Sequence, residues 1–488
     1  MVTLLYFLLP HKLRGFMLLL ASCLFYMAFI PKYIFILFIT IAIDYVAGIY
    51  IEKSSGKRKR VWLWTSIIST CLVLFIFKYF NFFGTNFDAI ARILHWNYSI
   101  GVLKLILPIG LSFHTFQSLS YVIEVYRGQQ KAEHNFWIYS LYVMFYPQLV
   151  AGPIERPQNL LHQFYERHNF DYTNAVSGLR RMLFGLFKKV VIADNAAVMV
   201  NFVYSDPHNF GGIPLLIATV LFAFQIYCDF SGYSDIAIGS AQVMGFRLRE
   251  NFDRPYFSKS ISEFWKRWHM SLSSWFKDYV YIPLGGSRVL PARHFFNLFL
   301  TFTLSGLWHG ANWTYVIWGA LNGFYLMGSL LTARIRQTLS VSLKLERFLR
   351  LQTGIQRLST FSLICFSWIF FRADSLADAF YIATHLFTGF GSYVKNILIP
   401  GIFNGLDFLT AKTFLGIDLG VPFRTFAFTV LMIILMELIQ RASRRDNLGE
   451  IASTQPLWLR WSIYYLVAGS IIFFLNSMPS INFIFFQF

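Results

Sequence analysis

The chain has 488 residues, of which 56% are hydrophobic and 14% are charged, and its mean hydropathy is +0.51. Soluble globular proteins carry roughly a quarter charged residues, so this composition argues against a soluble protein and indicates a polytopic membrane protein. The formal net charge is +18, but the cations stand in short clusters between apolar runs. That distribution is typical of membrane-protein loops and argues against nucleic-acid binding.

The first part of the chain predicts regular membrane crossings. A crossing needs about 20 apolar residues, and we expect such helices at residues 15–30, 33–51, 61–80 and 102–125. The densest basic cluster, from Lys53 to Arg60, lies between the second and third of these. By the positive-inside rule this loop faces the cytoplasm.

The pattern becomes irregular after residue 136. Residues 136–150 are apolar, but Gly152, Pro153 and Pro157 prevent a helix from continuing, which predicts a re-entrant or half-span element. Further spans are expected at residues 190–204, 213–227, 313–331, 423–439 and 458–474. We therefore expect an all-α membrane protein with roughly eleven transmembrane helices plus re-entrant or interfacial helices, counting about 20 residues for each crossing. Residues 1–488 are expected to form a single integral-membrane domain, with a catalytic core at about residues 101–375.

A polar, glycine-bearing stretch interrupts the apolar chain between residues 264 and 312. It contains two histidines that each follow a tryptophan, His269 and His309. Polar groups at membrane depth lose their water, so a polar insert there indicates a function. Neutral imidazole is the side chain best suited to accept a proton near pH 7, which makes both histidines candidate catalytic residues.

Each histidine also has a structural interpretation. A lone histidine at the start of a hydrophobic span, as His309 is, usually has a structural role, although Gly306 and Gly310 beside it would let a substrate come close. His269 lies on an expected helix over residues 265–279 that has an aromatic and a cationic face. Such a helix would also serve as a simple anchor at the membrane interface.

Three clusters of cations and two carboxylates complete the candidate residues. The cations could be solvated helix ends or could dock an anionic ligand; they are Arg180, Arg181, Lys188, Lys189, Lys266 and Arg267. Asp229 and Asp235 follow an apolar span, where an unpaired carboxylate is costly. We expect them to pair with Arg247, Arg249 or Arg254. No residues have metal-ligand spacing, because two histidines alone are too few, so no metal is predicted.

The motifs taken together resemble the membrane-bound O-acyltransferases (MBOAT), most closely the branch of alginate O-acetyltransferases. The resemblance covers nearly the whole chain in the same order, at residues 107–113, 145–154, 185–189, 229–235, 251–256, 264–288, 307–310 and 370–374. It implies the MBOAT fold, in which a central tunnel encloses the site, with His309 as the signature histidine and His269 as the second polar residue. Each short motif alone would be weak, but their order is specific.

The resemblance also implies the reaction. The acyl donor would be cytoplasmic acetyl-CoA, docked on the basic residues named above, with no tightly bound cofactor. The acetyl group would pass outward through the bacterial inner membrane to an envelope polysaccharide such as alginate or peptidoglycan. An extracytoplasmic SGNH-type acetyltransferase, on a separate chain, would be the partner protein.

Two other functions remain open at this point. The first is a transporter or flippase of a lipid-linked glycan without acyl chemistry, which would be expected to contain inverted repeats. We find none in the sequence. The second is a lipid acyltransferase of the same superfamily, which would use a long-chain donor. The resemblance to the alginate branch favours acetyl transfer over both.

Overall fold

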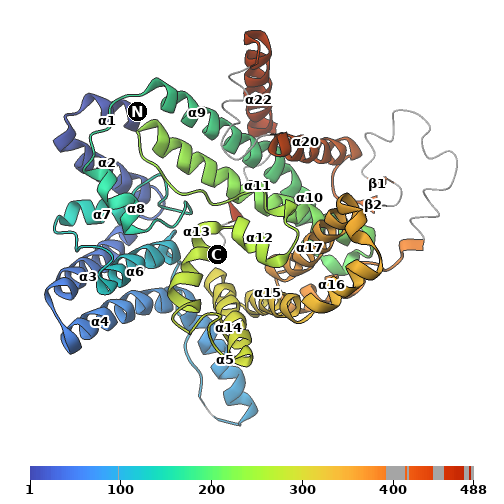
Figure 1. Cartoon of the computed structure of the whole chain (residues 1–488), viewed down its shortest axis with the longest axis horizontal. Coiled ribbons are helices and arrows are strands. Elements are labelled where there is room, and N and C mark those ends of the chain that lie inside the picture. The colour runs from blue at the N-terminus through green and yellow to red at the C-terminus, as the bar shows by residue number, and fades with distance from the viewer. Residues whose placement is uncertain (97, 392–412, 415–416, 443–454, 478–482, 485–488) are drawn as a thin grey trace. The chain divides into compact units, whose positions relative to one another are not determined.

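The computed structural model describes residues 1–96, 98–391, 413–414, 417–442, 455–477 and 483–484. Helices dominate this part of the chain; the strands found in it are β1 (Thr413–Phe414) and β2 (Ile417–Asp418), an antiparallel pair of two residues each (Figure 1). The prediction of an all-α fold is confirmed. Contacts within the chain define two compact units, which are described in turn. That residues 1–488 form one domain stays a prediction.

Six helices in the described ranges are long and apolar enough to cross a membrane, or seven if one bent pair counts as a span. They are Pro31–Lys53, Gly56–Ile93, Ile213–Val243, Leu349–Arg372, Phe423–Arg441 and Leu457–Asn476. A multi-pass membrane protein is therefore confirmed, but the number of roughly eleven crossings, which assumed about 20 residues each, is not. Several expected spans form shorter helices.

The first unit comprises Met1–Met182 and Ser234–Glu250. Its helices are α1 (Val2–Leu8), α2 (His11–Met27), η1 (Pro31–Tyr33), α3 (Ile34–Lys53), α4 (Gly56–Leu74), η2 (Phe75–Tyr79), α5 (Phe80–Ile93), α6 (Leu111–Arg127), α7 (Phe136–Met144), α8 (Pro157–Leu160) and η3 (Leu161–Phe164). It also contains most of α9 (Tyr172–Phe187) and the end of α11 (Ile213–Val243).

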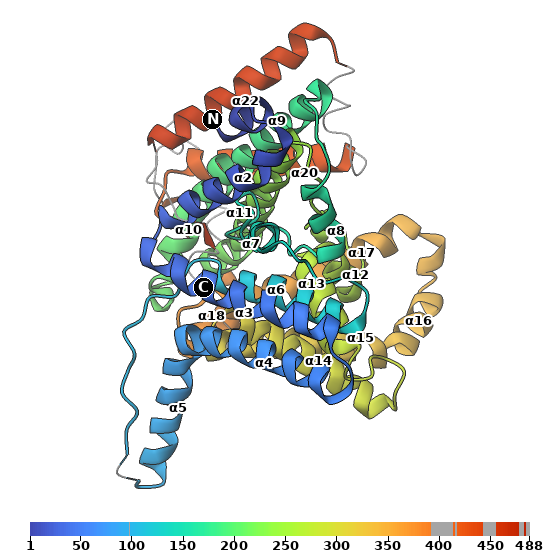
Figure 2. The same cartoon turned by 90° about the vertical axis from the view of Figure 1, so that its left-hand side faces the viewer.

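Helices α3, α4 and α6 pack against one another, and Figure 2 shows α3 beside α4. Gly48 lets α3 approach α6, because a Cβ atom there would lie 2.7 Å from the Tyr121 ring. The buried Asp44 on α3 accepts hydrogen bonds from Ser66 (2.6 Å) and Thr70 (3.0 Å) on α4. These bonds satisfy a carboxyl group inside a membrane span, where an unpaired one would be costly.

The apolar segment after residue 136 is a short helix followed by a loop, as its glycine and prolines predict. The Asn135 side chain caps α7 by accepting hydrogen bonds from the N–H groups of Trp137 and Ile138. Helix α7 ends at Met144, and the chain then runs through a largely buried loop until Pro157 begins α8. Non-helical backbone of this kind must be enclosed by protein or line a cavity if it lies within a membrane.

The second unit comprises Leu183–Tyr233 and Asn251–Phe488. Besides the remaining parts of α9 and α11, its helices up to residue 331 are η4 (Lys188–Ala193), α10 (Asp194–Tyr204), η5 (Pro207–Asn209), η6 (Pro255–Phe257), α12 (Ile261–Arg267), α13 (Met270–Phe276), η7 (Lys277–Tyr281), α14 (Pro291–His309) and α15 (Trp313–Leu331). They are followed by α16 (Ala333–Ser342), η8 (Leu345–Arg347), α17 (Leu349–Arg372), α18 (Leu376–His385), α20 (Phe423–Ala442) and α22 (Leu457–Ser477).

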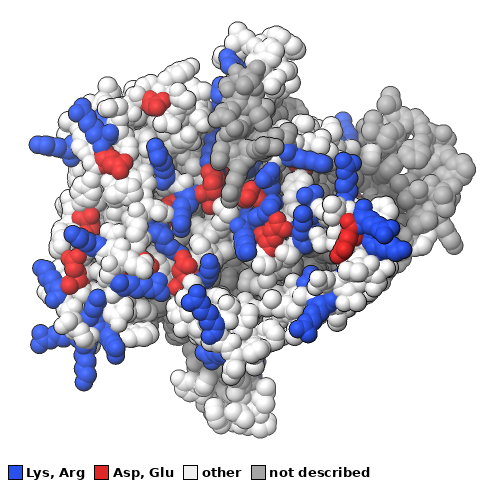
Figure 3. Space-filling model, viewed as in Figure 1, with Lys and Arg blue, Asp and Glu red and all other residues white. Residues whose placement is uncertain are grey.

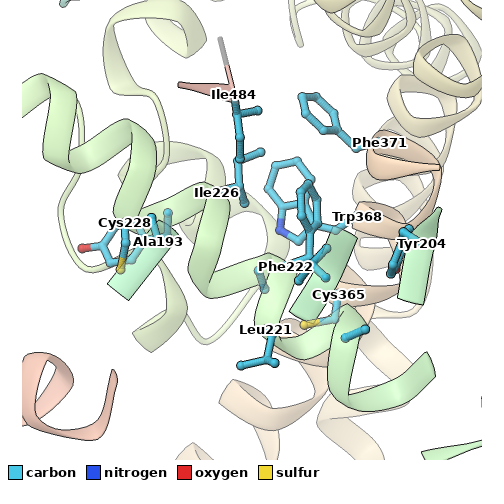
Figure 4. Close-up of a cluster of buried hydrophobic side chains, with 14 of the residues drawn as sticks. Ala193, Tyr204, Leu221, Phe222, Ile226, Cys228, Cys365, Trp368, Phe371 and Ile484 are labelled. Carbon is cyan, nitrogen blue, oxygen red and sulfur yellow. The ribbon is translucent and has the colours of Figure 1, made fainter. Parts of the chain in front are cut away.

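An aromatic core lies at the centre of the second unit. Trp318 from α15 and Trp368 from α17 stack with ring centroids 5.6 Å apart, and each is only 1% exposed. Figure 4 shows Trp368, Phe222 and Phe371 within this core. Offset aromatic stacking adds to the hydrophobic stabilisation of such a cluster. The core therefore gives the side chains that border it a rigid support.

Helices α14 and α15 form a tight hairpin with glycines at the contact. A Cβ atom on Gly306 would lie 2.2 Å from the Tyr315 carbonyl oxygen, and one on Gly319 would lie 2.3 Å from the Phe302 carbonyl oxygen. No real Cβ atom is found that close, so the two backbones touch because these positions lack side chains. The hairpin fixes the position of its turn, where His309 lies.

Candidate active site

His309 is the last residue of α14, and its side chain is buried among aromatic rings. The ring centroids of Trp308, Trp318 and Phe371 lie 4.9, 5.1 and 5.3 Å from the imidazole centroid. Trp318 and Phe371 meet it nearly at right angles, at 89° and 74°. Rings on several sides leave the imidazole little freedom to rotate, as a group that exchanges a proton with a bound substrate requires.

The chain reverses immediately after His309. Gly310 ends α14 in an extended conformation, and Asn312 caps α15 by accepting a hydrogen bond from the Thr314 N–H at 3.0 Å. The expectation that Gly306 and Gly310 leave room for a substrate is wrong. A Cβ atom on Gly310 would lie 2.2 Å from the Tyr315 ring, so that ring and the α15 backbone already fill the space beside both glycines.

His269 lies at a break between two short helices, not on one interfacial helix as expected. Helix α12 ends at Arg267, Trp268 is extended, and His269 takes the left-handed conformation at φ +42° and begins α13. Left-handed backbone costs roughly 1–2 kcal/mol for a residue other than glycine. Three aromatic residues of this stretch, Trp268, Trp275 and Phe276, are buried in the unit, whereas Trp265 and Tyr279 are only partly buried.

Asn251 holds the backbone of the two residues that follow His269. Its carbonyl oxygen accepts a hydrogen bond from the Met270 N–H at 2.9 Å. Its side-chain oxygen accepts hydrogen bonds from the Ser271 hydroxyl at 2.8 Å and the Ser271 N–H at 3.3 Å. Asn251 is fully buried, so these bonds are protected from competition by water. They supply a physical reason for the left-handed conformation of His269.

The His269 ring is buried and packs edge-on against Phe230, with the two centroids 4.5 Å apart. The α12–α13 junction lies outside the helices long enough to span a membrane. Burial disfavours the charged imidazolium and lowers the pKa of His269 to about 3. The imidazole is therefore neutral at physiological pH, and in this form it can donate one hydrogen bond and accept another.

The two histidines border the same aromatic core. Trp318, which contacts His309, stacks on Trp368, and Trp268, which directly precedes His269, lies 5.1 Å from Trp368 by ring centroids. Residues distant in sequence are thereby brought to one region of the second unit. That either histidine is catalytic stays a prediction, as does the tunnel around them.

Lys188 and Lys189 are buried and bonded to acceptors within the second unit. The Lys189 ammonium lies 2.7 Å from an Asp229 carboxylate oxygen and 2.9 Å from an Asp194 carboxylate oxygen. The Lys188 ammonium donates to the Ser231 hydroxyl at 2.9 Å. Both lysines lie on η4, a π-helical stretch, and such stretches are frequent at functional sites. A role of either lysine in binding the acyl donor stays a prediction.

The other four candidate cations differ in their surroundings. In the first unit, Arg181 bonds Asp235 at 3.0 Å and also pairs with Glu250, and Arg180 is partly buried. In the second unit, Arg267 pairs with Glu263 at 2.6 Å, whereas Lys266 is exposed. Among these cations, the position of Lys266 is the most open to a ligand from solvent.

Both carboxylates are paired, with cations that the sequence analysis had not assigned to them. Asp229 bonds Lys189, and Asp235 bonds Arg181. Asp194 was not singled out from the sequence. Its pairing with Lys189 joins residues five positions apart, which a regular α-helix does not place together but a π-helix does.

Comparison with known proteins identifies the family. The sequence model of the family described as "MBOAT, membrane-bound O-acyltransferase family" matches residues 130–371 of this chain. That range includes both histidines. The chain is 39% identical to the probable alginate O-acetylase AlgI of Pseudomonas aeruginosa, over 83% of this chain and 75% of that protein. It is 36% identical to the peptidoglycan O-acetyltransferase of Helicobacter pylori, over 74% and 71%.

A more distant relative is the teichoic acid D-alanyltransferase of Bacillus subtilis, which is 29% identical over 44% of this chain and 57% of that protein. The extent of the closer matches shows that the chain belongs to the membrane-bound O-acyltransferase family. It is therefore an O-acyltransferase of the membrane, and the resemblance found in its motifs is confirmed.

Proposed function

We propose that this protein moves an acetyl group from cytoplasmic acetyl-CoA across the bacterial inner membrane for the O-acetylation of an envelope polysaccharide. The observation that supports it most is that His309 and His269 border one aromatic core within the region matching the family. The similarity to alginate and peptidoglycan O-acetylating proteins points to an acetyl donor and a polysaccharide acceptor.

His309 acts as the general base of this reaction. It takes the proton from the attacking hydroxyl group as the new C–O bond forms at the thioester carbonyl. The C–S bond then breaks, and the departing thiolate of CoA receives a proton. The aromatic rings around His309 hold the imidazole in place and exclude water, which would otherwise compete with the acceptor hydroxyl.

His269 contributes a second, neutral imidazole that orients the donor or the acceptor. Burial lowers its pKa to about 3, so it can bond a polar group of the substrate without carrying a charge. The phosphates of CoA would be held by cations of the second unit, namely Lys188, Lys189, Lys266 and Arg267. Arg180 and Arg181, in the first unit, stay separate candidates for binding CoA. No tightly bound cofactor or metal takes part in this proposal.

The thioester of acetyl-CoA and the attacking hydroxyl meet inside a tunnel, because CoA and the polysaccharide remain on opposite sides of the membrane. A two-carbon group needs only a narrow passage, whereas neither charged CoA nor a polysaccharide crosses a bilayer. The loop from Lys53 to Arg60 marks the cytoplasmic side by its excess of cations. An extracytoplasmic SGNH-type acetyltransferase on another chain supplies the attacking hydroxyl, carries the acetyl group as an ester, and passes it to a hydroxyl group of the polysaccharide.

The test compares the acetyl content of envelope polysaccharides in cells that lack the protein and in cells that regain it. Restoration by the unchanged protein and failure with His309→Ala is the expected result. His294→Ala is a matched control, because it removes another histidine of α14, close to its first residue. A glycan transporter would instead change the amount of exported polysaccharide and leave its acetyl content per sugar unaltered.

A long-chain lipid acyltransferase would leave polysaccharide acetylation unchanged and would alter the acyl chains of membrane lipids. Lipid analysis of the same cells therefore separates that function from the proposed one. Unchanged acetyl content in cells lacking the protein, under conditions in which it is expressed, would refute the proposed acceptor class.

A further inference from the structure

Helix α16 leaves the end of α15 at a sharp bend. The axes of α15 and α16 differ by 56° across Thr332, and none of the ten α16 residues is buried. Ten residues extend about 15 Å at 1.5 Å per residue, too short to cross a hydrocarbon core of about 30 Å. Helix α16 is followed closely by α17, which is long and apolar enough to cross a membrane, and a short helix in that position is suited to lie along the membrane surface.

An apolar stripe runs along one side of α16. Ile335, Leu339 and Leu343 recur at intervals of four residues, the spacing that places side chains on one helix face, and they are 60%, 53% and 65% exposed. Arg334 and Arg336 flank the first of them. The helix is thus amphipathic, and the side chains of its apolar stripe are exposed.

The segment that contains α16 is strongly basic. Residues 333–352 include five cations and one acid, Glu346; the cations are Arg334, Arg336, Lys344, Arg347 and Arg350. The space-filling view in Figure 3 shows Lys and Arg side chains near the place where Figure 1 labels α16. Gln352, near the start of α17, donates a hydrogen bond to the hydroxyl group of Ser340 on α16 at 2.9 Å. This bond connects the two helices.

We propose that α16 and the turn after it form a binding surface for anionic phospholipids on the cytoplasmic leaflet. The apolar stripe enters the boundary between headgroups and acyl chains, and the cations contact the lipid phosphates. The excess of cations assigns this segment to the cytoplasmic side. Because α15 and α17 continue from both ends of the segment, α16 is held at the height where headgroups lie.

This surface has a consequence for the position of His309. Helix α15 has 19 residues, about 28 Å at 1.5 Å per residue, and begins four residues after His309. Anchoring its far end in the headgroup layer limits how far the α14–α15 hairpin can shift along the membrane normal. The inference depends on α16 itself and holds whichever acyl donor the protein uses.

The first experiment measures lipid retention by native mass spectrometry. The full-length protein, stripped of lipid in detergent, is mixed with phosphatidylglycerol and phosphatidylcholine in equal amounts. Phosphatidylglycerol should be retained preferentially, and R334Q/R336Q should weaken that retention by up to about fivefold for each removed charge, the factor equal to about 1 kcal/mol per cation near an anionic surface.

K57Q/K59Q is the matched control, because it removes two positive charges from the other basic cluster and leaves α16 intact. If K57Q/K59Q weakens phosphatidylglycerol retention as much as R334Q/R336Q does, lipid retention depends only on the net charge of the protein. The proposed surface is then refuted. Equal retention of both lipids by the unchanged protein refutes it as well.

The second experiment places spin labels at L339C or Q337C, with the native cysteines replaced, in nanodiscs of equal phosphatidylglycerol and phosphatidylcholine. The label on the apolar stripe should collide mainly with oxygen, which concentrates in the bilayer, and the label at position 337 mainly with a water-soluble nickel complex. If both labels report water, α16 lies off the membrane and its exposed face serves another partner, which overturns the proposal.

Discussion

His309 is the last residue of a regular helix, whereas His269 lies at a break between two helices of seven residues each. The position of His309 follows from local packing, since the glycines of the α14–α15 hairpin bring two backbones into contact. The position of His269 depends on a partner distant in sequence, Asn251, and on a left-handed backbone. Two candidate residues of one site are therefore held by different means and should respond differently to substitution.

The largest expected effect is the loss of His309 itself. His309→Ala should lower the rate of acetyl transfer by about 10²–10⁴-fold, the contribution typical of a general base. His269→Ala should have a smaller effect, because His269 orients a substrate in the proposed mechanism. The measurement is the transfer of labelled acetyl from acetyl-CoA by the protein reconstituted in vesicles. A larger loss for His269→Ala would reverse the assignment of the two roles.

The second prediction concerns the contact that places His309. Gly306→Ala puts a methyl group 2.2 Å from the Tyr315 carbonyl oxygen, so the helices must separate. Overpacking typically costs about 1–3 kcal/mol, and a clash with backbone should reach the upper end. Thermal unfolding of the purified protein in detergent measures this cost, and the rate of acetyl transfer should fall with it.

Gly328→Ala is the control for that variant, because Gly328 lies on α15 of the same hairpin with no atom within 4 Å of an added Cβ. It should keep full activity and equal or slightly higher stability, since alanine favours a helix over glycine. If Gly306→Ala and Gly328→Ala have the same stability and the same rate of acetyl transfer, the Gly306 contact does not hold the hairpin.

The third prediction concerns the residue that holds His269. Asn251→Ala leaves the buried Ser271 hydroxyl and N–H without their acceptor and releases the α12–α13 junction. We expect kcat to fall by about tenfold to a hundredfold, because a catalytic group displaced by about 1 Å can lose that much. The KM for acetyl-CoA should change less than kcat if Asn251 acts by positioning His269.

Ser271→Ala removes only one of those bonds and should lower kcat by less than Asn251→Ala. Ser274→Ala is the matched control, because the Ser274 hydroxyl bonds the Ser271 carbonyl oxygen on the same short helix and does not reach Asn251. Should the three variants lose the same activity, the effect would come from α13 stability in general.

The sequence predicts the parts of this molecule that depend on local pattern. Apolar runs reveal some of the membrane helices but not their number, and the prolines and glycine after residue 150 reveal that no helix continues there. The expectation that His309 starts a span is wrong, because Gly310 and the capping Asn312 after it place His309 at the end of α14. Each of these signals acts over a few residues, so it can be read without knowledge of tertiary contacts.

Other features depend on contacts that the sequence does not reveal. Residues 265–279 contain no glycine or proline, and their aromatic residues recur as on a helix, so nothing local indicates the break at His269. The partner of Asp229 could not be found either, because Lys189 lies forty positions earlier in the chain. Arginines nearer in sequence were the natural candidates, but distance along the chain does not determine which charges meet once helices pack.

The smallest expected effect is a dependence of stability on pH that comes from His269. Its pKa is about 3 in the folded protein and 6.5 for an unperturbed imidazole. Below 6.5 the unfolded chain therefore binds a proton that the folded protein refuses, and the free energy of unfolding falls as the pH is lowered toward 3. The loss should be about 1.4 kcal/mol per pH unit between these two pKa values, and above 6.5 protonation of His269 no longer opposes folding. Thermal unfolding at pH 7 and pH 5 should show a weaker pH dependence for His269→Gln than for the unchanged protein.

His162→Gln, which removes an exposed histidine, is the control and should retain the original pH dependence of stability. If His269→Gln also retains it, the imidazole of His269 is reached by water in the folded protein, and the buried junction held by Asn251 is more open than its hydrogen bonds indicate.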